Sequence, residues 1–564
     1  MNFYYKYLSI TVIATALVSL IISFPYSFES KTFELKTIAL SDENWENGIY
    51  LHTGGFLISA SPENDKLNVG DNVHTATLAK RKIISKTKSG NYINVFVDGG
   101  VINPQHVNNN TIYHTTKSFT STFIFHFIFL LTGAVVLFLI LFYDYKAYSI
   151  IYIIVFLTGT YVAVKTTIYS PIDEAAHFDF VNYIEKNKEL PKACLGLDHT
   201  YLSMDGKAIN IPGHLNHEYI QPPMYYAGSA LIASLINLFS NDAHVRLISL
   251  RLAGVLLLML SIFIIRNAYL LLTNKGIIKQ NDHLLFSISL LFALSPIFLK
   301  IMIPVNNEHF LLPLISLLVF LIIRDICKDR TTLLTAGLIG ATVATAILTK
   351  LTAAYIFPLV FGYFLLRKKY KEVVAFSIIT GAILSPWLYF NLQHYNAFTG
   401  VKQHFEIVQP IVNPYNVKFT VVNIIEGLPG FYGGLWFSSS FNSLEGVIGV
   451  IIKTTLLLSL CYSIFWGFKA LKESGVKINN TSFYLNYILA GMVLLNISIL
   501  GYITLTTPVF SMIGRYLFMN LLSIILIFYV FTSHILNQQF VKFFSGFCFC
   551  AAWFLLYNYI YSLS

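Results

Sequence analysis

The sequence predicts an all-α polytopic membrane protein of about 13 transmembrane helices, with a small β-rich extracytoplasmic insertion. Two observations carry this prediction. Hydrophobic residues make up 55% of the chain and charged residues only 12%, where a soluble protein has roughly 25% charged residues. Apolar runs of about 20 residues, the length that crosses a bilayer, recur along the chain. We interpret the net charge of +10 as a cytoplasmic-loop bias. No basic stripe with exposed aromatics is visible, so nucleic-acid binding is not expected.

The predicted spans follow the apolar runs in order. They are 7–24, 121–142, 147–168, 247–272, 284–303, 309–323, 331–348, 351–366, 373–392, 444–466, 483–505, 517–535 and 543–562.

Positive charge sets the predicted topology. Basic clusters at 275–279, 324–330, 367–371 and 469–477 should all face the cytoplasm. Together with a cytoplasmic N-terminus, this requires that the apolar stretch 223–239 does not cross. At 1.5 Å per residue it would span only about 25 Å. We therefore predict a juxtamembrane helix on the outer face, with the C-terminus outside.

Five segments organise the predicted chain. Residues 25–117 hold alternating patches such as NYINVFVDGG, typical of a small extracytoplasmic β domain. The full set is a signal-anchor helix at 1–24, the β-rich domain at 25–117, a transmembrane catalytic module at 118–392, an external loop at 393–443 and C-terminal transmembrane helices at 444–564. The module contains an external loop at 167–222. One loop cysteine, Cys194, supports neither a disulfide framework nor a zinc cluster.

The sequence SPIDEAAH at 170–177 is the first candidate for chemistry. Asp173 and His177 would share one face of a helix that starts near Pro171. Adjacent carboxylates at an outer membrane surface suit a general base or a divalent metal ligand. They equally suit an N-terminal helix cap, and the residues leave both readings open.

Four cations fall at the outer ends of predicted spans, against the positive-inside rule: Arg246, Arg251, Lys350 and Arg515. Single cations there can snorkel to the interface. Four that converge on one face favour an anionic ligand such as a phosphate or diphosphate. Asn306-Asn307-Glu308 lies at another outer span end, as a helix cap or as a second polar wall of the site.

Six motifs in order resemble the GT-C membrane glycosyltransferases, especially bacterial relatives of protein mannosyltransferases and aminoarabinose transferases. They are S-P-x-D-E-x-x-H, Q-P-P-x-Y-Y, R-L-x-x-x-R-L-x-G, N-N-E, L-T-K and G-R-Y, and they cover roughly residues 147–535. The resemblance places the family's first acidic residue at Asp173, beside Glu174. Its second acidic position falls at Glu308, where the family often has Asp.

The resemblance implies a GT-C-like fold and a sugar transfer in a bacterial cytoplasmic membrane, with the active site on the extracytoplasmic face. The donor would be a polyprenyl-phosphate-linked sugar and the acceptor a hydroxyl on a glycan, lipid or protein. Asp173 and Glu174 would be catalytic, with inversion at the anomeric carbon. The residues implied for substrate binding are His177, Gln221, Arg246, Arg251, Asn307, Glu308, Lys350, Arg515 and Tyr516.

Other readings stay open at this stage. A divalent cation such as Mg²⁺ or Mn²⁺ is one, with Asp173, Glu174 and His177 as candidate ligands. A transporter or flippase of lipid-linked glycans would use the same cations, but it would place charges at the midplane. A non-catalytic membrane partner that keeps the fold is the third function considered.

Overall fold

The computed structural model describes most of the chain from residue 148 onward. The described residues are 50–53, 56–59, 72–74, 80–89, 92–97, 100–102, 131, 148–166, 174–193, 195–202, 208–328, 332–400, 420–422, 444–473, 481–506 and 514–563. The predicted spans 7–24 and 121–142 lie outside them, apart from residue 131, and so does Asp173.

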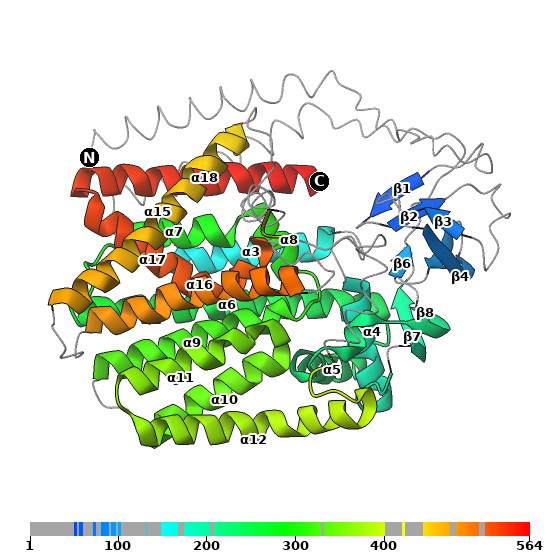
Figure 1. Cartoon of the computed structure of the whole chain (residues 1–564). Coiled ribbons are helices and arrows are strands. Elements are labelled where there is room, and N and C mark those ends of the chain that lie inside the picture. The colour runs from blue at the N-terminus through cyan, green and yellow to red at the C-terminus, as the bar shows by residue number, and fades with distance from the viewer. Residues whose placement is uncertain are drawn as a thin grey trace.

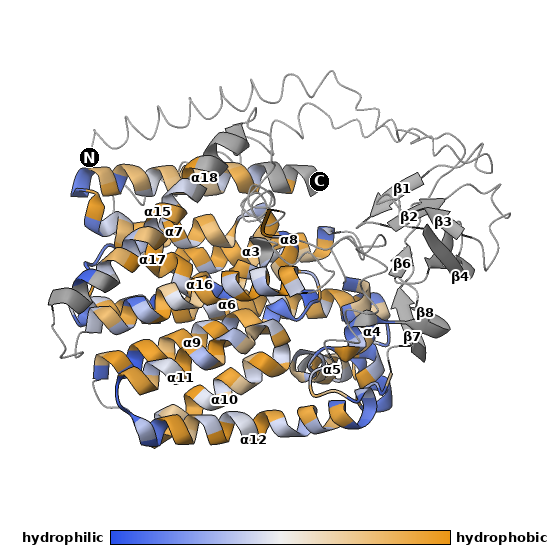
Figure 2. Ribbon diagram, in the orientation of Figure 1, coloured by the Kyte–Doolittle hydropathy of each residue, from blue (hydrophilic) through white to orange (hydrophobic). Residues whose placement is uncertain are grey.

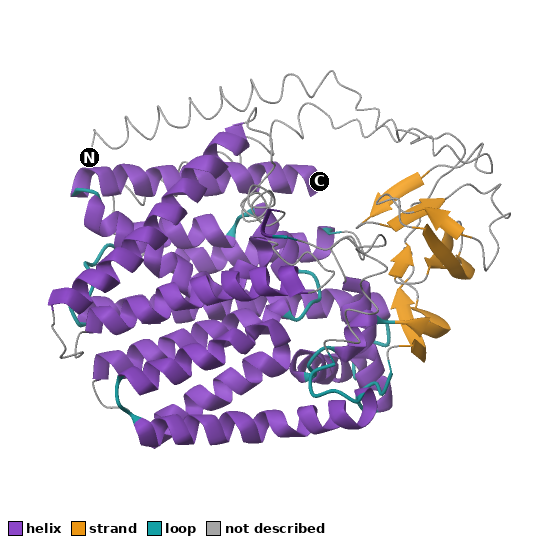
Figure 3. Cartoon of the chain, viewed as in Figure 1, coloured by secondary structure: helices purple, strands orange, loops and turns teal. Residues whose placement is uncertain are grey.

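Helices make up most of the described chain (Figure 3), and one lies at every span predicted from residue 147 onward. They are α3 (Tyr148–Lys165), α4 (Glu174–Asn187), α5 (Met224–Asn237), α6 (Ala243–Asn274), α7 (Asp282–Ala293), α8 (Pro296–Met302), α9 (Glu308–Lys328), α10 (Leu333–Thr349), α11 (Ile356–Leu366), α12 (Tyr370–Tyr395), α15 (Leu444–Glu473), α16 (Thr481–Thr506), α17 (Leu521–Ile535) and α18 (Gln538–Leu563). Three 3₁₀ helices join them: η1 (His217–Ile220), η2 (Leu351–Tyr355) and η3 (Gly514–Asn520).

Within the described residues, six helices are long and apolar enough to cross a membrane, or seven spans if one bent pair counts as a span. The six are α6, α9, α12, α16, the continuous stretch Tyr516–Ile535, and α18 up to Tyr557. Figure 2 shows hydrophobic residues along the long helices and hydrophilic ones gathered toward their ends. The chain is thus a multi-pass membrane protein, while the count of thirteen crossings stays a prediction.

The predicted span 284–303 is broken into α7 and α8, which are bent by 64°. Proline has no N–H and cannot continue the hydrogen-bond ladder of α7, so Pro296 begins a new helix. Ser295 caps that helix, since its hydroxyl accepts from the N–H of Phe298 at 3.3 Å.

One end of the helical body carries α4 and α5, which hold several of the residues singled out in the sequence. Figure 1 shows α4 running across the ends of the long helices, with α5 seen end-on beside it. Helix α5 has 14 residues, or about 21 Å, and is not among the helices found able to cross. Helix α6 has 32 residues, about 48 Å against a hydrocarbon core of about 30 Å. Its excess length lets the first turns of α6 support α4 and α5.

The strands lie at the same end of the helical body as α4 (Figure 1). A hairpin of β7 (Leu195–Leu202) and β8 (Ala208–Leu215) links α4 to η1. Further strands are β1 (Tyr50–Thr53), β2 (Phe56–Ser59), β3 (Asn72–His74), β4 (Lys80–Ser89), β5 (Tyr92–Val97) and β6 (Gly100–Ile102), paired antiparallel in the orders β1-β2 and β3-β4-β5-β6. Most of 25–117 lies outside the described residues, so a β-rich domain there stays a prediction.

A small apolar core lies beneath α4, separate from the large core of the long helices. Phe178 and Phe180 of α4 pack there with Tyr219 of η1, Tyr226 of α5 and Leu247 of α6. The Phe180 and Tyr226 rings stack with centroids 3.9 Å apart. This core fixes α4, η1 and α5 as one unit on the end of α6.

The topology is tested at His244, which is exposed at the start of α6. If 223–239 does not cross, His244→Cys in a background without native cysteines should react with a membrane-impermeant maleimide on intact cells. Lys275→Cys, exposed at the other end of α6, is the control and should react only after permeabilisation. The reverse pattern would refute the topology and the outer-face site with it.

Candidate functional site

Glu174 and Arg251 form an ion pair at the junction of α4 and α6. The guanidinium donates from Nε to Oε1 at 2.8 Å and from Nη2 to Oε2 at 2.6 Å. Both side chains are completely buried. Two parallel charged hydrogen bonds of this kind combine strength with a fixed orientation. The pair therefore locks the first residue of α4 against α6.

The same pair ties in two more segments. Arg251 Nη1 donates to the carbonyls of Ala163 and Thr166 at 3.0 and 2.7 Å, at the end of α3, where helix carbonyls lack intrahelical partners. The N–H of Val305, just before α9, donates to Glu174 Oε1 at 2.9 Å. The Glu174–Arg251 pair thus holds together the end of α3, the start of α4, α6 and the approach to α9.

A second carboxylate joins α4 to η1. Asp179 Oδ2 accepts from Asn216 Nδ2 and from the hydroxyl of Tyr219, both at 2.8 Å. Asn216 also caps η1, because its Oδ1 accepts from the N–H of Glu218 at 2.8 Å. These bonds position Glu218 beside α4.

His177, Tyr226 and Glu218 form a buried chain of hydrogen bonds. His177 Nδ1 lies 2.8 Å from the hydroxyl of Tyr226, and that hydroxyl donates to Glu218 Oε2 at 3.1 Å. His177 Nδ1 is also 3.5 Å from Glu218 Oε2. Burial first, and then the charge of Glu218, raise the pKa of Tyr226 well above its usual value. The phenol therefore stays protonated and remains a donor.

Lys350 brings three predicted segments together. Its ammonium donates to Glu308 Oε1 at 2.8 Å and lies 4.9 Å from the centre of the Tyr516 ring. Glu308 is the first residue of α9, Lys350 ends α10 and Tyr516 belongs to η3. The Lys350 side chain is 13% exposed, so a small part of it remains open to a ligand.

The remaining predicted residues occupy different settings. Asn307 is 2% exposed, and its Oδ1 has no hydrogen-bond partner among the described residues. Arg246 Nη1 donates to Asn182 Oδ1 at 2.7 Å. Gln221 follows η1, half-buried, and its N–H donates to the carbonyl of Glu218. Of Arg515 only its backbone place at the start of η3 is described.

A metal site is not apparent in the described part of the chain. No group of three or more His, Cys, Asp or Glu side chains there could hold an ion. The oxygens of Glu174 accept from Arg251 and from the Val305 N–H, an arrangement that suits an ion pair better than a metal ligand. Whether a metal ion binds at the start of α4 therefore depends on Asp173, which lies outside the described residues.

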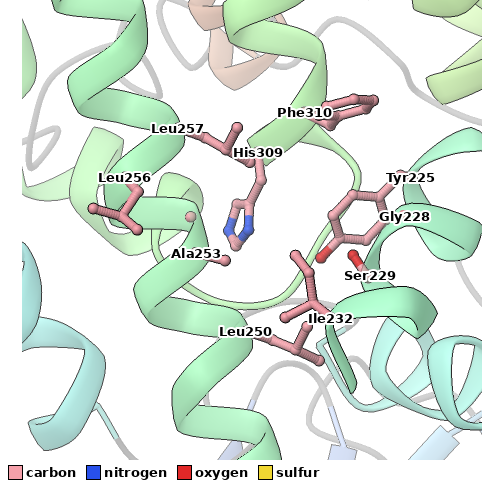
Figure 4. Close-up of a pocket in the computed structure, with 11 residues that line it drawn as sticks. Tyr225, Gly228, Ser229, Ile232, Leu250, Ala253, Leu256, Leu257, His309 and Phe310 are labelled. Carbon is pink, nitrogen blue, oxygen red and sulfur yellow. The ribbon is translucent and has the colours of Figure 1, made fainter. Parts of the chain in front are cut away.

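A cavity of about 280 Å³ lies between α5, α6 and the start of α9 (Figure 4). Its lining is mostly apolar, and the ring of His309 projects into it between the side chains of α5 and α6. Gly254 makes room for that ring: a Cβ at residue 254 would lie 2.6 Å from His309 Cε1. Two adjacent residues at the start of α9 thus face different surroundings. Glu308 contacts Lys350, and His309 lines the cavity.

Sequence reasoning missed Glu218 and Tyr226, because His217–Tyr226 resembles a membrane-anchoring turn. One signal was available: Asn216 directly before His217-Glu218 is a good N-cap, which indicates an ordered short helix there. Burial of Asp179 could not be seen from the sequence, since its partners Asn216 and Tyr219 lie 37 and 40 residues away.

No protein-family model and no curated protein matches the chain. Among solved structures, the apo oligosaccharyltransferase of Archaeoglobus fulgidus aligns with 75% of this chain and 56% of its own, at 10% identity and a TM-score of 0.41. ArnT from Cupriavidus metallidurans bound to undecaprenyl phosphate aligns with 68% of this chain and 77% of its own, at 13% identity and a TM-score of 0.30. This chain spans little more than half the length of the archaeal enzyme. At these TM-scores the likeness carries no argument, and function has to be inferred from the residues of this chain.

The packing of His309 predicts unequal effects at two glycines of the cavity. Gly254→Ala should destabilise the protein by about 1–3 kcal/mol, the usual cost of overpacking, because the ring has to move. Gly228→Ala is the matched control, since it also lines the cavity on a helix but has nothing within 4 Å of its Cβ; it should be neutral or slightly stabilising. Thermal unfolding in detergent compares them, and equal stability would refute the packing of His309 on α6.

Proposed function

We propose that this chain is a membrane glycosyltransferase that uses a polyprenyl-phosphate-linked sugar on the extracytoplasmic face of a bacterial cytoplasmic membrane. The observation that carries the proposal is the contact of Lys350 with Glu308 and Tyr516. These residues belong to the N-N-E, L-T-K and G-R-Y motifs, which are far apart in the sequence. Their meeting supports one site built from the motifs that resemble the GT-C enzymes.

Lys350 is the residue proposed to bind the donor phosphate. An ammonium has three N–H donors, and Glu308 takes one of them at 2.8 Å. Glu308 and the Tyr516 ring would hold the cation in place before the donor binds, and a preorganised charge stabilises a departing anion best. Arg515, next to Tyr516 in the sequence, is the second candidate for the phosphate.

Asp173 is the proposed base. Helix α4 begins at Glu174, and Asp173 directly precedes it in the sequence. The acceptor hydroxyl would attack the anomeric carbon while its proton passes to the carboxylate. The bond from that carbon to the phosphate oxygen would break, and the phosphate would leave with the electron pair. Attack opposite the leaving group inverts the anomeric carbon.

Glu174 and Arg251 take a different role in this proposal from the one the motifs imply. We infer that they hold the site together, since each binds the other and both are completely buried. The polar wall would instead include Asn307, whose Oδ1 is unpartnered among the described residues, with His177 as a second contact for a sugar or acceptor hydroxyl.

The catalytic assignment is tested by Asp173→Asn. Asn is as good a helix cap as Asp but cannot take a proton, so turnover should fall by about 10² to 10⁴, the usual contribution of a general base. The measurement is release of polyprenyl phosphate by purified protein from a panel of polyprenyl-phosphate-linked hexoses and pentoses.

Glu189→Gln is the control, because this exposed carboxylate pairs with Lys192 at the surface and should not affect turnover. Glu174→Gln is unsuitable as a control, since it would remove the partner of Arg251. An Asp173→Asn protein with near-normal turnover would end the catalytic assignment.

A further inference from the structure

Two contacts join the short 3₁₀ helices η2 and η3. Lys350 immediately precedes η2, and its ammonium lies 4.9 Å from the centre of the Tyr516 ring in η3. Tyr355 is the last residue of η2, and its hydroxyl donates at 2.7 Å to Oδ1 of Asn520, the last residue of η3. At a rise of about 2 Å per residue, η2 carries Tyr355 about 10 Å from Lys350. The second contact therefore joins the far ends of the two helices, away from the end at which the lysine meets its tyrosine.

A third element, α16, packs against both 3₁₀ helices. Its Asn496 interacts with the Tyr355 hydroxyl and donates from Nδ2 to Met519 Sδ of η3 at 3.4 Å. We call Tyr355, Asn496 and Asn520 the Tyr355 junction. Its members are between 0% and 4% exposed, and a hydrogen bond in so dry a setting is stronger than the same bond in water. The junction thus ties η2, η3 and α16 together.

Stability alone does not account for this junction. Nδ2 of Asn520 and Oδ1 of Asn496 are buried and have no hydrogen-bond partner among the described residues. A buried group of this kind costs stability, and apolar side chains of similar shape would avoid the cost. A polar junction provides direction instead, because a hydroxyl hydrogen and a carbonyl oxygen meet well only in a narrow range of geometries. What it fixes is the placement of η2 against η3.

We propose that Tyr355 and Asn520 are positioning residues that hold Lys350 ready for the donor phosphate. Helix η2 connects them to the lysine directly, since the Ala353 N–H donates to the Lys350 carbonyl at 2.9 Å. If the far end of η2 is released, the start of η2 can shift and the ammonium can leave the Tyr516 ring. This inference rests on the proposed function for the identity of the ligand. The placement of Lys350 depends only on the junction.

The placement of Lys350 is measured without any substrate, from the rate at which a water-soluble anhydride acetylates it in the purified full chain. Mass spectrometry of the peptide that contains Lys350 follows the reaction. The reagent has to reach a nitrogen that Glu308 and the Tyr516 ring cover. Tyr355→Phe removes the hydroxyl but keeps the ring, and acetylation of Lys350 should become several-fold faster. Glu308→Gln removes the ion pair itself and is the positive control.

Binding of polyprenyl phosphate shows whether this placement matters for the ligand. Tyr355→Phe should bind it about tenfold more weakly than the wild type in an equilibrium titration in detergent, the lower end of what one charged hydrogen bond contributes. The double variant Tyr355→Phe/Asn520→Leu removes both partners, so most of the thermal stability should return. The weak binding and the fast acetylation should remain, which a purely stabilising junction would not produce.

Tyr363→Phe is the matched control. It removes another buried tyrosine hydroxyl from the following helix α11, one that donates to Asp325 Oδ2 at 2.7 Å, outside the junction. Thermal stability should fall as it does in Tyr355→Phe. Acetylation of Lys350 and binding of polyprenyl phosphate should match the wild type, which separates positioning from a general loss of packing.

Three results would overturn the proposal: wild-type acetylation of Lys350 in Tyr355→Phe, wild-type affinity for polyprenyl phosphate in that variant, or a double variant that regains affinity together with stability. Failure of the proposed function would look different. The wild-type protein would then bind no polyprenyl phosphate, while the acetylation rates would still decide whether the Tyr355 junction positions Lys350.

Discussion

The buried ion pair of Glu174 and Arg251 is the constraint on which the α4 end of the helical body depends. Each charge would cost several kcal/mol to bury alone. Here the carboxylate receives two guanidinium bonds and the Val305 N–H, and the guanidinium also reaches the carbonyls of Ala163 and Thr166. A pair so fully engaged leaves little freedom for the start of α4. The position of His177, one turn further on, follows from it.

Two further buried carboxylates also join separate elements through hydrogen bonds, around a small aromatic core. Asp179 of α4 receives donors from the η1 side, and Glu218 of η1 receives the hydroxyl of Tyr226 from α5. Since each carboxylate is satisfied by a different element, the three elements cannot shift independently. A rigid polar layer of this kind, at the ends of apolar spans, would suit the lipid-linked substrate that we propose.

Hydropathy predicted the helices well, because a span needs a run of apolar residues that is visible locally. Ser295-Pro296 is also a recognisable helix start, with a capping residue followed by proline, yet the predicted span ran through it. Cations in the wrong place for their topology singled out Lys350, which does meet the Glu308 segment. The same logic grouped Arg251 with Lys350, although Arg251 is fully buried and pairs with Glu174, 77 residues away. Which carboxylate a cation meets is decided by tertiary packing, and a single sequence does not contain that information.

The most direct test separates a structural Arg251 from one that binds phosphate. Arg251→Met would leave Glu174 buried without its partner, and we expect a loss of about 3–5 kcal/mol of stability in detergent unfolding. The double variant Glu174→Met/Arg251→Met should recover most of this loss, because no unpaired charge remains. An Arg251→Met protein that is as stable as the wild type but binds polyprenyl phosphate at least tenfold more weakly would contradict this account and return Arg251 to the donor site.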